Sequence, residues 1–294
     1  MSAPLLSHEF LRRLDRLRLA PNEPARGHLK GMHRANRTGS GMEFADYRPY
    51  RAGDELKNVD WHTYLRLDRL FVKLFVEEAD LPIYIFLDTS ASMSVGSPGK
   101  FDFGRKLAAA LAHVGFVNMD RVNLIAVAEG IVQERSGLRG KTQSWPAFAF
   151  LQQLECGGGT ALEPAFKQYF AVPRATGLIV VISDFLDPAG FEPGLRVLRN
   201  LRQDVLAVQL VSPGDFEPAA PGSEVVLVDA EDESETRKFV TPALLLAYRQ
   251  AFEAHGAALG AYCAGNAWGH VRATTDTNIE ELVLHALRKE GLLR

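Results

Sequence analysis

Short apolar runs alternate with helical patterns over residues 83–211, and no other feature of the sequence constrains the fold as strongly. The runs IYIFLD, RVNLIAV, LIVVIS and DVLAVQLV have the length and β-branched content of buried strands. Strands that alternate with helices form a parallel sheet that is covered on both faces. The sequence therefore predicts the α/β class, with a doubly wound, mostly parallel sheet.

The same patterns give the expected elements. We expect strands over 83–88, 121–127, 177–183 and 204–211, an edge strand over 131–135, and helices over about 100–118, 144–154, 161–170 and 191–202. For the remainder we expect a strand over 224–229, a long helix over about 241–260, a strand over 268–273, and a last helix over 278–290 capped by Asn278 or Thr277.

The region before this alternation has a different character. Residues 7–18 place apolar side chains at helical intervals, which predicts a short amphipathic helix with Ser7 as its cap. A basic, glycine-punctuated loop follows over 19–43, and residues 43–78 predict β structure with a helical turn. We therefore expect an N-terminal β-rich region over 1–80 and an α/β domain over 81–294, with its core over 81–211 and a C-terminal α/β extension.

Composition excludes little. The chain has 294 residues, 47% apolar and 23% charged, with a net charge of −3, which is typical of a globular protein and selects no partner. It has no apolar run long enough to span a bilayer and no signal-peptide core, so we expect a cytoplasmic protein without an integral membrane segment. Cys156 and Cys263 lack metal-ligand spacing and are expected to be reduced thiols.

Oxygen-bearing side chains gather where several predicted elements begin or end. Asp88 ends the first strand of the α/β region, and Ser90 and Ser92 follow it at once. Thr160 comes after three glycines at the start of a predicted helix, and Asp184 directly follows another buried strand. Because ligands of open α/β sheets bind at the carboxyl ends of strands, we expect these five residues to converge at one edge.

Oxygen-only ligation indicates a hard cation. Mg²⁺ is the first candidate, with Mn²⁺ or Ca²⁺ as alternatives, because softer metals prefer His or Cys. Two carboxylates and neutral hydroxyls would leave the ion with charge and an exchangeable position, which an Asp or Glu of another protein could fill. A lone Asp-x-Ser-x-Ser is weak, since Ser and Asp are common in turns and caps; the three matched segments together favour metal binding.

These residues resemble a known site. The DTSAS of residues 88–92, the Thr160 of GGGT and the Asp184 of ISD are similar to the metal-ion-dependent adhesion site of von Willebrand factor A-type domains, and all five motif positions are filled. The resemblance covers residues 81 to about 211 and implies a von Willebrand A or Rossmann-like sheet. It implies that Asp88, Ser90, Ser92, Thr160 and Asp184 are the metal ligands.

The preceding segment also resembles a family. From about Gly41 onward, EFADYRPYRAGDELKNVDWHTYLR before DTSASM is similar to the signature of a widespread bacterial family of unknown function, numbered fifty-eight. Members of that family are commonly associated with MoxR-type AAA+ ATPases, so the resemblance implies an adaptor or chaperone-like role beside such an ATPase. Some relatives carry N-terminal membrane helices and this chain does not, which puts membrane attachment in doubt. We expect a cytoplasmic location, with peripheral attachment at the inner membrane through a partner as the alternative.

This segment holds a second set of candidate residues. In the structural alternative, Gly53 and Asp54 form a turn, Trp61 packs against the α/β domain, and the Arg and Asp side chains make hydrogen-bonded pairs. Alternatively it forms a partner surface, because exposed Arg and aromatic residues are enriched at interface hot spots. The partner-binding candidates are Arg48, Arg51, Trp61 and Arg66.

Two other function classes stay open. Mg²⁺ could serve a hydrolase, but the chain lacks the second acid of aspartyl phosphotransferases, a complete phosphate loop and a nucleophile elbow. The arginines of residues 12–37 could bind nucleic acid, but they alternate with leucines and lack a reading motif, so no nucleic acid is expected. We therefore expect a non-enzymatic protein that offers a Mg²⁺ site to an acidic residue of a partner, either a MoxR-type ATPase or its client.

Overall fold

The computed structural model describes residues 4–19, 42–51, 53–54, 56–77, 81–201, 203–216, 222–228, 230 and 235–286. The chain forms two compact units. The sheet unit comprises Met1–Ala25 and Leu81–Arg294, and the hairpin unit comprises Arg26–Asp80. Most of the predicted basic loop over 19–43, and the end of the predicted last helix beyond residue 286, lie outside the described residues.

A six-stranded sheet forms the centre of the sheet unit, in the order β10-β7-β6-β3-β4-β5. Its strands are β3 (Pro82–Asp88), β4 (Arg121–Val127), β5 (Ile131–Leu138), β6 (Leu178–Ser183), β7 (Asp204–Val211) and β10 (Gly269–Thr274). Every neighbouring pair is parallel except β4 and β5, which are antiparallel. The predicted α/β class with a mostly parallel sheet is confirmed.

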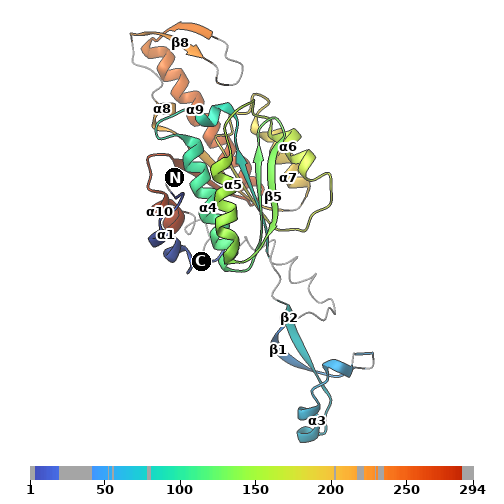
Figure 1. The fold of residues 1–294 in the computed structure, drawn as a ribbon. Helices are drawn as coiled ribbons and strands as arrows, with labels where there is room; N and C mark the ends of the chain where they lie inside the picture. The colour runs from blue at the N-terminus through green and yellow to red at the C-terminus, as the bar shows by residue number, and fades with distance from the viewer. Residues whose placement is uncertain are drawn as a thin grey trace. The chain divides into compact units, whose positions relative to one another are not determined.

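Helices cover both faces of this sheet (Figure 1). On one face, Phe86 of β3 packs in a buried cluster with Phe166 of α6 (Leu162–Tyr169), Leu195 of α7 (Phe191–Asn200) and Leu259 of α9 (Pro242–Gly265). The other face is covered by α4 (Lys100–Val117), with α5 (Ser144–Gln153) packed beside α4. Because both faces are covered, every residue of β3, β6 and β7 is buried, which explains their continuous apolar sequences.

Close packing on the α4 face depends on a glycine. A methyl group added at Gly104 of α4 would lie 2.9 Å from Leu87 Cδ1, 3.2 Å from Leu210 Cδ1 and 3.5 Å from Ile182 Cγ2. These three leucine and isoleucine side chains come from β3, β7 and β6. The helix therefore lies directly against the middle of the sheet.

The strand order reverses beside β3. The chain passes from β3 outward to β4 and β5, and then returns to the other side of β3 to form β6, β7 and β10. The loops after β3 and β6 thus leave the sheet next to each other at its carboxyl edge, which is where open α/β sheets bind ligands. Both loops begin at a predicted site residue, Asp88 or Asp184.

The N-terminal helix packs within the sheet unit. It is α1 (His8–Leu14), shorter than the predicted 7–18, and Ser7 Oγ accepts a hydrogen bond from Phe10 N as predicted for its cap. Phe10 and Leu14 are buried. Asp15, just after the helix, hydrogen-bonds with Nε2 of His113 in α4 at 2.9 Å and accepts from Lys141 Nζ at 2.6 Å. These contacts attach the first residues of the chain to α4.

The hairpin unit contains the predicted β structure and helical turn. Strands β1 (Met42–Pro49) and β2 (Phe71–Glu77) are antiparallel, and between them lie the short 3-10 helix η1 (Leu56–Asn58) and α3 (Trp61–Leu67). The Asp60 carboxylate caps α3 by accepting from the N–H groups of His62 and Thr63.

The C-terminal part contains elements that the sequence patterns did not predict. The predicted strand over 224–229 is β8 (Glu224–Val228), and it pairs with an additional antiparallel strand, β9 (Glu235–Phe239). A further short helix there is α8 (Pro213–Phe216), and another unpredicted one, η2 (Ala91–Ser94), follows β3 much earlier in the chain. The last described elements are α10 (Ile279–Glu281), capped by Asn278, and η4 (Leu282–Ala286).

The attachment of α1 predicts a pH-dependent stability. Burial raises the pKa of Asp15, but hydrogen bonds from Lys141 and His113 outweigh it and leave the pKa below the ordinary 3.8. A lowered pKa stabilises the fold above pH 3.8, and this contribution is lost as the pH falls through the folded-state pKa. Asp15→Asn should therefore lower the free energy of unfolding by about 1 kcal/mol at pH 7.

Urea unfolding of wild type and Asp15→Asn between pH 7 and pH 3 measures this difference, which should shrink at the acid end. Asp276→Asn, at an exposed position, is the control and should change the free energy of unfolding by less than about 0.5 kcal/mol. Equal unfolding midpoints for Asp15→Asn and wild type at pH 7 would contradict the assigned contact.

Candidate metal centre

The candidate centre lies at the carboxyl ends of two neighbouring strands. Leu87 of β3 pairs with Ile182 of β6, so Asp88 and Ser183 are the next residues along the two strands. Asp88 is 1% exposed and Asp184, which follows Ser183, is 2% exposed. Two carboxylates are therefore buried at the point where the strand order reverses.

Hydrogen bonds fix the Asp88 carboxylate. Its Oδ1 accepts from Ser90 N at 2.9 Å, and its Oδ2 accepts from Ser183 Oγ at 2.5 Å. The Ser90 and Ser92 hydroxyls lie 3.1 Å apart. The predicted Asp88, Ser90 and Ser92 thus form one compact group of oxygens.

The glycine loop before α6 is bonded to the same group. Gly157 N donates to Thr89 O at 2.8 Å, and Ala91 N donates to Gly158 O at 2.9 Å. Gly158 has φ +76°, a left-handed conformation that favours glycine. Thr160, two residues later, is buried. The three predicted segments therefore meet at one edge of the sheet.

Lys100, the first residue of α4, lies in the same place, and sequence reasoning missed it. Its side chain is 2% exposed, and its Nζ is 2.6 Å from Asp184 Oδ2 and 3.9 Å from Asp215 Oδ2. A signal was present in the sequence, because a cation at a helix N-terminus opposes the helix dipole unless an anion compensates it. Ser183 was missed as well, although it is the one polar residue at the end of an apolar strand.

Charge is incompletely compensated at this edge. Burial raises the pKa of Asp88 to about 6, the negative charge of Asp184 acts in the same direction, and hydrogen bonds from Ser183 and Ser90 oppose the rise. Lys100 supplies one positive charge to the two carboxylates. A further cation would favour the ionised form of Asp88.

The donor types fit a hard ion. Carboxylates and hydroxyls are the ligands that Mg²⁺ and Ca²⁺ prefer. Cys156 lies beside the glycine loop, but burial, and secondarily the charge of Asp88, raise the pKa of its thiol to about 12, so it stays protonated at neutral pH. Within the described ranges, no three His, Cys, Asp or Glu side chains cluster as a metal-binding group. A centre here would depend on two carboxylates together with the hydroxyls.

The other predicted residues belong to the hairpin unit. Arg48 donates to Asp54 Oδ1 at 2.8 Å, and Arg51 N donates to Asp54 Oδ2 at 2.7 Å, as the structural alternative predicted. Trp61 is 52% exposed and meets Tyr64 edge to face. These exposed aromatic rings keep the partner-surface alternative open.

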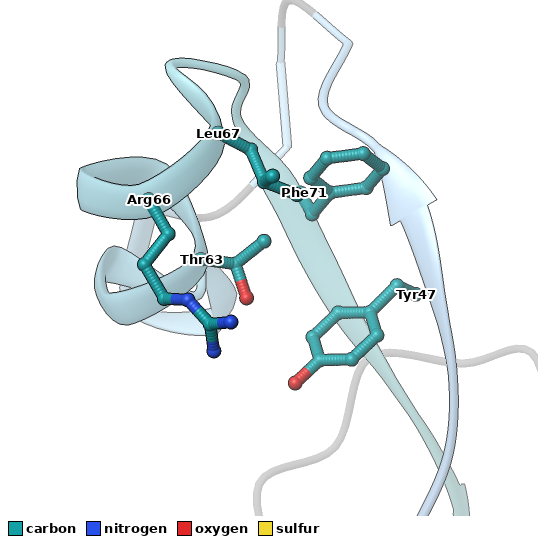
Figure 2. Close-up of a pocket in the computed structure, with 5 residues that line it drawn as sticks. All are labelled: Tyr47, Thr63, Arg66, Leu67 and Phe71. Carbon is teal, nitrogen blue, oxygen red and sulfur yellow. The ribbon is translucent and has the colours of Figure 1, made fainter.

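Arg66 lines a pocket of about 300 Å³ in the hairpin unit. Figure 2 shows Thr63, Arg66 and Leu67 on α3, with Tyr47 and Phe71 on the strands opposite. The hydroxyls of Tyr47 and Thr63 donate to Asp60 Oδ2, at 2.7 Å and 3.1 Å. The pocket therefore combines apolar walls with the guanidinium of Arg66.

Comparison with known proteins identifies the family. The model of the family described as "Protein of unknown function DUF58" matches residues 46–260. The chain belongs to the DUF58 family. The predicted resemblance to family fifty-eight is thus confirmed, and the family match covers most of the hairpin unit's described residues and five of the six strands of the sheet, all but β10.

This DUF58 chain is similar to uncharacterized proteins of Mycobacterium. Those of Mycobacterium tuberculosis and Mycobacterium bovis are each 29% identical over 250 residues, which cover 83% of this chain and 78% of the relative. The similarity extends well beyond the sheet but brings no described activity with it.

Solved structures with a related shape are more distant. "Conserved hypothetical protein BatB" from Bacteroides thetaiotaomicron is 15% identical to this chain. The match covers 72% of this chain and 98% of the BatB chain, with a TM-score of 0.45. An "aerotolerance-related membrane protein" from Bacteroides fragilis is 15% identical, covers 71% and 98%, and has a TM-score of 0.41. With TM-scores this low, neither likeness carries an argument. In the described part of this DUF58 chain, no helix is long and apolar enough to cross a membrane.

The hydrogen bond from Ser183 to Asp88 predicts a measurable loss on mutation. Ser183→Ala removes a donor from a buried carboxylate, which should lower the free energy of unfolding by about 1.5–3 kcal/mol. Denaturant unfolding at pH 7.5 in EDTA measures this. Ser94→Ala is the matched control, since the exposed Ser94 hydroxyl donates only to Ala91 O, and it should cost less than about 0.5 kcal/mol. Equal losses for the two variants would refute the role of Ser183.

Proposed function

We propose that this chain is a non-enzymatic interaction protein whose sheet unit is a von Willebrand factor A-type domain with a metal-ion-dependent adhesion site. The observation that carries the proposal is the pair of buried carboxylates, Asp88 and Asp184, at the ends of adjacent strands where the strand order reverses. Loops that bear hydroxyl groups meet at the same edge. This combination supports a divalent cation held between strand ends.

The chain's own residues have distinct roles in this proposal. Asp88, Ser90 and Ser92 offer ligands from the loop after β3, and Asp184 and Thr160 complete the set directly or through water. Mg²⁺ is the first candidate, with Mn²⁺ or Ca²⁺ as alternatives, and when bound it would attract an Asp or Glu of the partner. Ser183 and the Ser90 N–H hold the Asp88 carboxylate in place, which suits a fixed ligand better than an attacking nucleophile.

The proposed partner is a protein with an acidic contact residue. Membership of the DUF58 family supports a MoxR-type AAA+ ATPase, or a client of one, as that protein. We place the complex in the cytoplasm, or peripherally at the inner membrane through the partner. The exposed Trp61 and the pocket at Arg66 offer a second contact surface for it. Nucleic acid is not the proposed partner, because the arginines of residues 12–37 alternate with leucines and form no recognisable reading motif.

Metal binding is testable without the partner. Mg²⁺ should raise the unfolding temperature of the wild type, because an ion that binds only the folded state stabilises it by about 2.7 kcal/mol at a hundred times its dissociation constant. Asp88→Ala should abolish this shift. Glu134→Ala changes an exposed acid in the middle of β5 and should keep it. A wild type whose unfolding temperature is unchanged by Mg²⁺, Mn²⁺ and Ca²⁺ would refute the metal centre.

Partner binding is tested by a pull-down from cell extract with Mg²⁺ or with EDTA, using wild type, Asp88→Ala and Glu134→Ala as baits. The expected result is a protein retained only with Mg²⁺, by wild type and Glu134→Ala. Retention that is equal in EDTA and on Asp88→Ala would exclude a metal bridge. Turnover of phosphate esters by the purified chain alone would instead favour the alternative that the protein is a Mg²⁺-dependent hydrolase.

A further inference from the structure

Lys100 is buried inside the candidate centre, where the ligand set of the proposed function assigns it no role. Its ammonium lies 2.6 Å from Asp184 Oδ2, and both side chains are 2% exposed. A buried ion pair is costly to form, and removal of one partner leaves an uncompensated charge. The chain therefore keeps a fixed positive charge against a carboxylate that the proposed function assigns to a divalent cation.

The surrounding structure holds Lys100 there. It is the first residue of α4, and the preceding loop is tied to the end of β10 by the Thr275 hydroxyl, which donates to Pro98 O at 2.8 Å. Because the backbone of Lys100 is fixed at the start of α4 and its side chain is 2% exposed, the ammonium lies among the carboxylates of this edge.

A second carboxylate lies near this ammonium. Asp215 Oδ2 is 3.9 Å from Lys100 Nζ. Asp215 is itself held, since its Oδ2 accepts from Ser212 N at 2.8 Å and its carbonyl accepts from the Tyr248 hydroxyl at 2.8 Å. Lys100 can thus turn toward Asp215 and release Asp184 without losing a counter-charge.

The summed charge of the site determines how Lys100 affects the binding of a cation. Asp88, Asp184, Asp215 and Lys100 sum to a double negative charge, so a divalent cation brings the group to neutrality. Without Lys100, the loaded group would keep a negative charge, which repels an incoming carboxylate. Because like charges repel strongly in a buried site, Lys100 opposes the bound cation, and an incoming carboxylate relieves that repulsion.

We propose that Lys100 couples the two ligands of the site: it weakens the hold on a divalent cation alone and strengthens the complex of cation and partner carboxylate. The inference rests on the proposed function and adds its regulation. By thermodynamic linkage, the partner carboxylate increases the affinity for the metal by the same factor by which the metal increases the affinity for the carboxylate. The site would therefore load fully only when an acidic partner is present.

Calorimetric titration of the full chain with Mg²⁺ tests this, in sodium chloride and in sodium acetate of equal ionic strength, with acetate as the carboxylate probe. For wild type, acetate should tighten Mg²⁺ binding. Lys100→Met should bind Mg²⁺ about tenfold more tightly in chloride and gain little from acetate. Lys106→Met, on the exposed side of the same helix, should behave as wild type.

Two further variants keep the test decisive if Lys100→Met folds poorly. Lys100→Arg keeps the charge and should keep the gain from acetate. Asp215→Asn keeps an acceptor for Ser212 N but removes the second counter-charge, so it should weaken Mg²⁺ binding. The coupling would be overturned if Lys100→Met had the Mg²⁺ affinity and the acetate gain of wild type, or if Asp215→Asn had an unchanged Mg²⁺ affinity. Either result would leave the proposed metal centre standing. Absence of Mg²⁺ binding by wild type would overturn the proposed function together with the coupling.

Discussion

Two carboxylates are buried next to each other in this protein, and most of the carboxyl edge of the sheet serves to compensate them. A buried charge is tolerated only when it is hydrogen-bonded and paired. Ser183 and the Ser90 N–H bond Asp88, and Lys100 pairs with Asp184. The loops after β3 and β6 and the start of α4 are positioned by these contacts.

The sheet produces this arrangement by its topology. Reversal of the strand order between β3 and β6 sends their loops out side by side, and helices on both faces keep water from the strands. The tight approach of α4 at Gly104 sets its first residue at the same edge. The position of the Lys100 charge in the candidate centre therefore depends on the close packing of α4 on the sheet.

The hairpin unit contributes a different kind of surface. Tyr47, Trp61 and Tyr64 are exposed, and its pocket presents a guanidinium beside apolar walls. The DUF58 match extends over most of this unit's described residues and over five of the six strands of the sheet. Exposed aromatic and arginine side chains are the residue types enriched at interface hot spots.

The sequence by itself determined the strands, helices and most of the candidate ligands. Buried strands need continuous apolar runs, and ligands of α/β sheets lie just after them, so Asp88 and Asp184 could be found by position alone. Unit boundaries, the pairing of β9 with β8 and the contacts of α1 were decided by tertiary structure. Lys100 illustrates why: its partner Asp184 is 84 residues away, and no local pattern records which distant carboxylate a buried lysine will meet.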